Sequence, residues 1–106
     1  MAATELSGFR LTPKAEHDLE EIWLYSAETW SPDQADIYID SLVHTIETLV
    51  AMPTIARERN EFDPPVRIQP SAEHLIVYRV QDPLLIVIRI LGGRQNWRAI
   101  LEIIDG

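Results

Sequence analysis

The 106-residue chain contains no cysteine and only one lysine, Lys14. Without a thiol it can form neither a disulfide framework nor a thiolate nucleophile or metal site, which fits a reducing cytoplasm. No apolar run approaches the roughly 18 residues that a membrane-spanning helix needs, and the N-terminus lacks the basic-then-apolar pattern of a signal peptide. These absences predict a soluble, cytoplasmic protein without membrane association, and the length predicts one domain over residues 1–106.

The patterns of several kinds of functional site are also absent. The histidines His17, His44 and His74 lie far apart in the sequence and form no close-spaced ligand pattern. The pair Gly92-Gly93 follows a predicted strand but lacks the spacing of a nucleotide-binding loop. No Ser-His-Asp set can be assembled from the spacing of the serines. The residues therefore predict no metal site, no cofactor and no catalytic group.

Charge is distributed unevenly along the chain. The formal net charge is −8, and residues 1–64 carry 13 acidic but only 4 basic side chains, whereas residues 65–106 carry 4 acidic and 5 basic ones. Non-specific binding to nucleic acid needs many Lys and Arg side chains that release counterions from phosphates. The acidic balance therefore argues against direct DNA binding by this chain, and most of the excess is typical of a solvated helix surface.

The first half has the pattern of a strand followed by two helices. Gly8–Leu11 is a candidate strand. Thr12-Pro13 and Ser31-Pro32 are each typical of an N-cap followed by proline at the first helical position. Apolar residues then recur at helical spacing in both segments, and Pro53 ends the second. Because the link between them is so short, the two helices are predicted to form an antiparallel hairpin.

The second half has the pattern of strands. Residues 54–65 are polar and bounded by prolines, which predicts a loop, and Val66–Gln69 is a candidate strand. His74–Val80 and Leu84–Leu91 predict a β-hairpin, and Trp97–Ile104 predicts a short amphipathic helix. The order is β-α-α-β-β-β with a short C-terminal helix or tail. It indicates an α+β fold, in which an antiparallel helical hairpin packs on one face of a small, mainly antiparallel twisted sheet.

Both strands of the predicted hairpin are apolar on both faces, although an antiparallel sheet with one wet face should alternate apolar and polar residues. Since neighbouring side chains in a strand point to opposite faces, one face should carry an aliphatic strip that the helices do not cover. The strip comprises Leu75, Val77, Leu85, Val87 and Leu91. Exposed apolar patches often mark partner sites, so either a partner or the chain's own C-terminal segment with Trp97 should cover this strip.

The arginines of the second half are the other candidates for a functional surface. Arg79 and Arg89 each interrupt an otherwise aliphatic face, so each guanidinium needs water, a carboxylate or a ligand. Salt bridges to the acidic helices are the alternative role for every arginine in this half. We expect Arg67, Arg79, Arg89 and Arg94 to contribute to a partner-facing surface, because they lie in the only part of the chain that is not acidic.

Several segments between residues 9 and 98 form an ordered set of motifs. They are Phe9-Arg-Leu-Thr-Pro-x-Ala15, Asp18-Leu-Glu-Glu-Ile-Trp23-x-Tyr25, Gln34-Ala-Asp36-x-Tyr38, Met52-Pro53, His74-Leu-Ile-Val-Tyr-Arg-Val80, and Ile90-Leu-Gly-Gly-Arg94 with Trp97. Each motif is weak alone, but the whole set at this spacing closely resembles the ParE branch of the ParE/RelE toxin superfamily. The resemblance implies the toxin of a type II toxin–antitoxin module, neutralised in a tight hetero-oligomeric complex by a small ParD-like antitoxin.

ParE-like toxins characteristically poison DNA gyrase, whereas RelE-like toxins cleave mRNA on the ribosome. Cleavage needs positive charge around the phosphodiester and an acid/base pair. RelE-like enzymes typically supply lysines and arginines on the sheet, and often a tyrosine beyond the last strand. Here the sheet half has no lysine and no tyrosine after Tyr78, and only His74 and Arg94 fill such positions. The resemblance therefore favours a gyrase inhibitor without catalytic activity of its own, with a ribosome-dependent mRNA endonuclease as the alternative.

Two departures from the family pattern remove positive charge. Gly92-Gly93-Arg94-Gln95 stands where many relatives read His-Gly-Arg-Arg, and Ala72-Glu73 stands where many read Gly-Arg. A further alternative is therefore a non-toxic relative that retains only antitoxin binding. In each case a disordered antitoxin tail could fold across the aliphatic strip and share it with Trp97 or displace Trp97. The expected partner-binding residues are Arg67, Leu75, Val77, Arg79, Leu85, Val87, Arg89, Leu91, Arg94 and Trp97.

Overall fold

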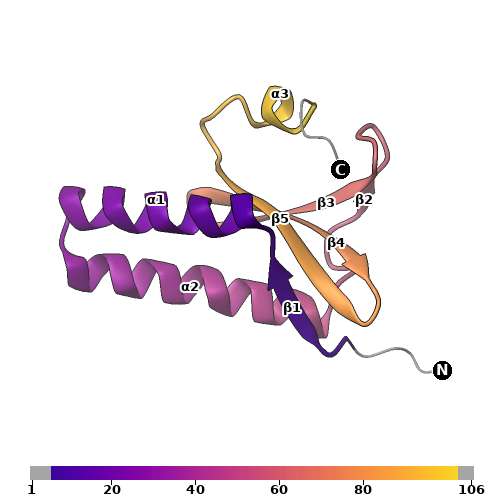
Figure 1. The fold of residues 1–106 in the computed structure, drawn as a ribbon, viewed down its shortest axis with the longest axis horizontal. Coiled ribbons are helices and arrows are strands. Elements are labelled where there is room, and N and C mark those ends of the chain that lie inside the picture. Colours follow the sequence, from indigo (N-terminus) through magenta and orange to yellow (C-terminus); the bar gives the residue numbers. More distant parts are fainter. Residues whose placement is uncertain (1–5, 103–106) are drawn as a thin grey trace.

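The computed structural model describes residues 6–102 (Figure 1). The elements are β1 (Gly8–Leu11), α1 (Pro13–Thr29), α2 (Pro32–Ala51), β2 (Glu58–Arg59), β3 (Val66–Ser71), β4 (His74–Gln81), β5 (Leu84–Gly92) and α3 (Trp97–Glu102). The strands form one sheet in the order β1-β5-β4-β3-β2, and all pairs are antiparallel except β1 with β5. The predicted α+β architecture is confirmed. The short strand β2 was not predicted, and the last two residues of the predicted C-terminal helix lie outside the described residues.

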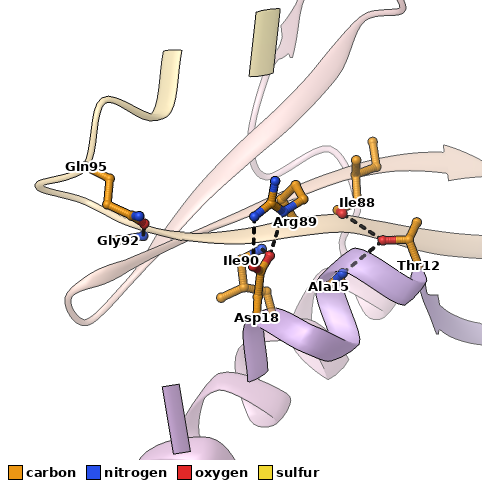
Figure 2. A network of polar contacts seen from close by, with 8 residues as sticks. All are labelled: Thr12, Ala15, Asp18, Ile88, Arg89, Ile90, Gly92 and Gln95. Carbon is orange, nitrogen blue, oxygen red and sulfur yellow. Dashed lines mark hydrogen bonds and ion pairs between the residues drawn. The ribbon is translucent and has the colours of Figure 1, made fainter. Parts of the chain in front are cut away.

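Both long helices begin where the sequence predicts, because a hydroxyl caps each of them. The Ala15 amide donates to Thr12 Oγ1 at 3.1 Å, and the Gln34 amide donates to Ser31 Oγ at 3.1 Å. Thr12 also donates its own proton to the carbonyl oxygen of Ile88 at 2.8 Å (Figure 2). One side chain therefore both starts α1 and fastens the start of α1 to β5.

A β-bulge in β5 changes which residues face the helices. Val77 pairs with Arg89 but Tyr78 pairs with Val87, so Ile88 is an extra residue between the two pairs. An extra residue shifts the alternation of side chains by one position. The expectation of simple alternation along the whole of β5 was therefore wrong: Leu85 and Val87, before the bulge, face the opposite way from that expected, whereas Ile90 and Leu91, after it, face as expected.

The helix-side core shows the effect of the bulge. Leu85 and Val87 are fully buried there, together with Tyr78 of β4 and Ile90 from beyond the bulge. Leu42 and Ile46 of α2 belong to the same core. The expectation that Leu85 and Val87 form an exposed strip is corrected: both lie under the helical hairpin.

The opposite face of the sheet has a second core of its own. Val77 and Leu91 are buried there against Phe62 from the loop after β2 and against Leu101 of α3. Trp97, Ile100, Ile68 and Ile88 pack around this cluster. Of the expected strip only Leu75 is left half-buried. The chain's own C-terminal helix and loop, rather than a partner, therefore cover the second apolar face.

We predict that the same substitution has different effects at Val87, which faces the helix-side core, and at the exposed Val80 of the neighbouring strand. Val87→Ala should lower the free energy of unfolding by about 2 kcal/mol, because it removes two methyl groups from a fully buried side chain and leaves a cavity. Val80→Ala is the matched control: this valine is 40% exposed and should change stability by less than about 0.5 kcal/mol. Urea unfolding of both variants measures the difference, and equal losses would contradict the register described above.

Candidate partner-binding surfaces

The Arg89 side chain is bound by α1. Its Nε donates to Asp18 Oδ2 and its Nη2 to Asp18 Oδ1, both at 2.8 Å (Figure 2). Asp18 Oδ2 also accepts the backbone N–H of Ile90 at 2.9 Å. The hydrogen bonds that Arg89 donates to Asp18 hold the pKa of Arg89 above its ordinary value. Of the three partners that the sequence left open for this guanidinium (water, a carboxylate or a ligand), the structure shows a carboxylate of the same chain.

Arg67 and Arg79 both line a hollow beside β3 and β4, although the pairing of Arg67 with Tyr78 places their side chains on opposite faces of the sheet. Arg67 Nη1 donates to the carbonyl oxygen of Ala56 at 2.6 Å, and Arg79 Nη2 donates to Gln81 Oε1 at 3.5 Å. Both arginines line a hollow of about 230 Å³, of which the exposed Val80 forms part of the wall. The structure therefore brings together two of the predicted arginines, and leaves Arg79 with one long, weak hydrogen bond among the contacts of the described residues.

Trp97 lies in a cluster of cations and aromatic rings beside α3. The Arg98 guanidinium carbon lies 5.0 Å from the centroid of the Trp97 ring and 5.7 Å from that of Phe62. Arg59 approaches the Trp97 ring at 5.8 Å and pairs with Glu61 at 2.8 Å. Sequence reasoning treated Arg59, Glu61 and Phe62 only as part of a polar loop. The presence of Phe62 close to Arg59 in a loop bounded by prolines was the feature of the sequence that could have indicated this cluster.

His74 and Arg94 line a groove between α1 and one end of the sheet. The groove has a volume of about 570 Å³, and Glu21, Tyr25 and Glu73 also line it. This groove was not predicted as a site, because only the family resemblance linked His74 and Arg94 and nothing else in the sequence places them close together. Arg94 thus shares this groove with two carboxylates.

A hydrogen bond from α2 orients the His74 ring. Tyr38 Oη lies 2.7 Å from His74 Nδ1 and accepts the backbone N–H of Glu73 at 3.2 Å. Because Tyr38 already accepts from that amide, we assign Tyr38 as the donor to Nδ1, which leaves the proton of the neutral imidazole on Nε2. Burial lowers the pKa of His74, and the charges of Glu73 and Asp18 act against that shift. Burial also raises the pKa of Tyr38.

Comparison with known proteins identifies the family. Residues 9–97 match the family described as "ParE toxin of type II toxin-antitoxin system, parDE". The chain belongs to the ParE toxin family. A Toxin ParE1 from Mycobacterium tuberculosis is 35% identical over 91 residues, which cover 85% of this chain and 93% of the relative. A Toxin ParE1 from Caulobacter vibrioides is 33% identical and covers 86% of this chain and 94% of the relative.

A solved structure supports the fold of this ParE-family chain. It is described as "Chromosomal ParDE TA system from P. aeruginosa", and the match has a TM-score of 0.72 over 85% of this chain and 98% of the other. At 21% sequence identity, the likeness concerns the fold. The family match and the two relatives confirm the resemblance read from the motifs, and this structure supports the predicted arrangement of helices and sheet.

The departure at Gln95 has a structural role in this ParE-family chain. Gln95 Oε1 accepts the backbone N–H of Gly92 at 2.6 Å (Figure 2), which closes the turn that carries Arg94. Within residues 6–102, no three His, Asp or Glu side chains are grouped so that they could hold a metal ion, and no helix there is long and apolar enough to cross a membrane.

The lowered pKa of His74 predicts a dependence of stability on pH. Above about pH 6.5, the ordinary pKa of histidine, the neutral ring is favoured in both the folded and the unfolded chain. As the pH falls below that value, the unfolded chain binds a proton that folded His74 resists, so the free energy of unfolding should decrease.

A substitution isolates this effect from that of the carboxylates. His74→Gln should flatten the fall in stability below about pH 6.5, whereas His44→Gln, at an exposed position on α2, should leave it unchanged. Urea unfolding at a series of pH values gives the comparison. A pH profile of His74→Gln parallel to that of the wild type would contradict the prediction.

Proposed function

We propose that this ParE-family chain is a toxin that a ParD-like antitoxin neutralises by direct binding and that inhibits DNA gyrase in the cytoplasm. It acts as a protein ligand without catalytic activity of its own. The observation that carries this proposal is the family match over residues 9–97, which spans all five strands and both long helices. The groove around His74 and Arg94 and the hollow lined by Arg67 and Arg79 support the proposal in different ways.

The groove around His74 and Arg94 is poorly suited to cleaving RNA. Glu21 and Glu73 line the same groove, and their negative charges oppose the approach of a phosphodiester. The His74 ring also has one nitrogen engaged by Tyr38, which leaves a single imidazole nitrogen for acid/base chemistry. The Arg94 guanidinium and one free nitrogen of the His74 ring are few groups for a reaction that needs both charge stabilisation and proton transfer.

The hollow between Arg67 and Arg79 is the better place for the antitoxin. It is lined by two arginines, Arg67 and Arg79, against one acidic residue, Glu58, and by apolar residues such as Pro64, Pro65 and Val80. Arg59 and Arg98 add two further cations around Trp97. This combination fits an acidic tail with apolar anchors that becomes ordered on binding. We propose this hollow as the antitoxin site in place of the predicted aliphatic strip, because the residues of the strip are mostly buried within the chain.

Expression of the chain alone, compared with its co-expression with the antitoxin of the adjoining gene, tests the proposal. We expect growth arrest with filamentation and an SOS response, relieved by the antitoxin, because a trapped gyrase leaves DNA breaks. The control is the empty vector. Arrested translation with cleaved mRNA would support the endonuclease instead, and unaffected growth would support a relative that has lost its toxicity.

Two alanine variants separate the binding arginine from the structural one. Arg79→Ala should weaken antitoxin binding by about tenfold while leaving the free energy of unfolding unchanged within about 0.5 kcal/mol. Arg89→Ala should lower the free energy of unfolding by about 3 kcal/mol, because it leaves the Asp18 carboxylate, only 11% exposed, without its cation. Calorimetric titration with the antitoxin and urea unfolding give the two quantities, and full antitoxin affinity in Arg79→Ala would remove this arginine from the interface.

A further inference from the structure

The end of the helical hairpin carries a concentration of exposed apolar side chains. Four of the seven large apolar side chains that are exposed in the described residues lie here: Leu24, Tyr25, Trp30 and Ile37, which we call the hairpin tip. Trp30 is 64% exposed and Ile37 59%. Figure 1 shows that this end of α1 and α2 projects beyond the sheet. No other element of the described chain gathers so much apolar surface outside the two cores.

The hairpin tip is held in place by its own contacts. The Tyr25 and Trp30 rings meet edge to face, with centroids 6.4 Å apart and an interplanar angle of 88°. Trp23 Nε1 donates to Asp36 Oδ1 at 2.8 Å and so joins α1 to α2 at this level. Aromatic side chains that are already ordered lose little conformational entropy on binding, which is typical of residues that dominate protein interfaces.

From residue 15 to residue 51 the two helices carry charge of one sign, and the nearby Arg94, which lines a groove with Tyr25, comes from the turn after β5. Residues 15–51 contain nine acidic side chains and no Lys or Arg. Among the described residues, Asp18 is the only one of the nine that pairs with an arginine. Glu28, Asp33 and Asp36, which lie next to the tip, are exposed. An apolar patch with such a border is complementary to an apolar depression surrounded by Lys and Arg.

We infer that the hairpin tip docks on a basic protein surface of the toxin's target, of the kind that holds duplex DNA. This inference rests on the proposed function, in which the target is DNA gyrase, and assigns the target contact to the tip. An enzyme that works on DNA must present Lys and Arg side chains to the phosphates, and the acidic hairpin matches such a surface in charge. A second copy of this chain is not the occupant, because two acidic tips repel each other.

This assignment gives the toxin two separate faces. The hollow between Arg67 and Arg79 takes an acidic antitoxin tail, which the carboxylates around the tip would repel. The tip contacts the target through Trp30 and Ile37 as anchors, and the surrounding carboxylates steer the approach. Because exposed charges contribute to the encounter, binding to the target should weaken as the salt concentration rises.

Matched substitutions of isoleucine test the inference with purified gyrase. Ile37→Ser removes an anchor, and the control Ile55→Ser changes the same side chain at a position with similar exposure, 54%, in the loop before β2. We expect Ile37→Ser and Trp30→Ala each to weaken gyrase binding by about tenfold and Ile55→Ser to leave it unchanged. Glu28→Gln should weaken the same binding and reduce its dependence on salt.

The outcomes separate this inference from the proposed function. Surface plasmon resonance measures the affinities for gyrase and for the antitoxin, and thermal unfolding checks that each variant is folded. If the wild type binds gyrase and both tip variants bind it equally well, the inference is wrong and the proposed function stands. If the tip variants lose affinity for the antitoxin instead, the tip belongs to the antitoxin site and the inference is wrong. If the wild type does not bind gyrase, both are overturned.

Discussion

The carboxylate of Asp18 joins the two layers of this fold at the point where β1 stops covering β5. The last pair between these strands is Leu11 with Val87, so the edge of β5 beyond the bulge has no neighbouring strand. Asp18 accepts the Ile90 amide and both donors of Arg89 there (Figure 2). Since backbone donors at a partly buried edge need partners, this side chain serves in place of a further strand. Asp18 holds α1 against the sheet just after the bulge, where the side chains of β5 change the face to which they point.

Most of the fold could be predicted because its boundaries depend on local chemistry. Thr12 and Ser31 act through hydrogen bonds to residues three positions away, and such spacing is visible in the sequence. The bulge could not be predicted. Leu84–Leu91 is apolar at every position but Arg89, so no alternation of polar and apolar residues marks where the phase changes. The conclusion that Leu85 and Val87 form a strip followed from a regular strand, and the strand is not regular.

The candidate surfaces were predictable only in part, for a related reason. Arg67 was predicted from its charge and Arg79 also from its place in an aliphatic face, and the hollow that both line depends on the pairing of β3 with β4. The sequence could not distinguish Arg89, which is neutralised inside the chain, from Arg79, which is not. The hydrogen bond between Tyr38 and His74 joins residues 36 positions apart, and no local pattern indicates such a contact. Long-range proximity is what the folded structure adds.

The second core under α3 bears on how long a free toxin can last. Phe62 and Leu101 shield Val77 and Leu91 on the side of the sheet that the hairpin leaves open, so the β-hairpin is sandwiched between two layers of the same chain. In the proposed function the toxin must act while it is separated from its antitoxin, at a time when no partner shields it from proteases or from other unfolded chains. A sheet that needed its antitoxin as a cover would be lost at the moment of release. In the proposed function, a chain that closes both faces of its sheet with its own residues needs no antitoxin to keep that sheet covered.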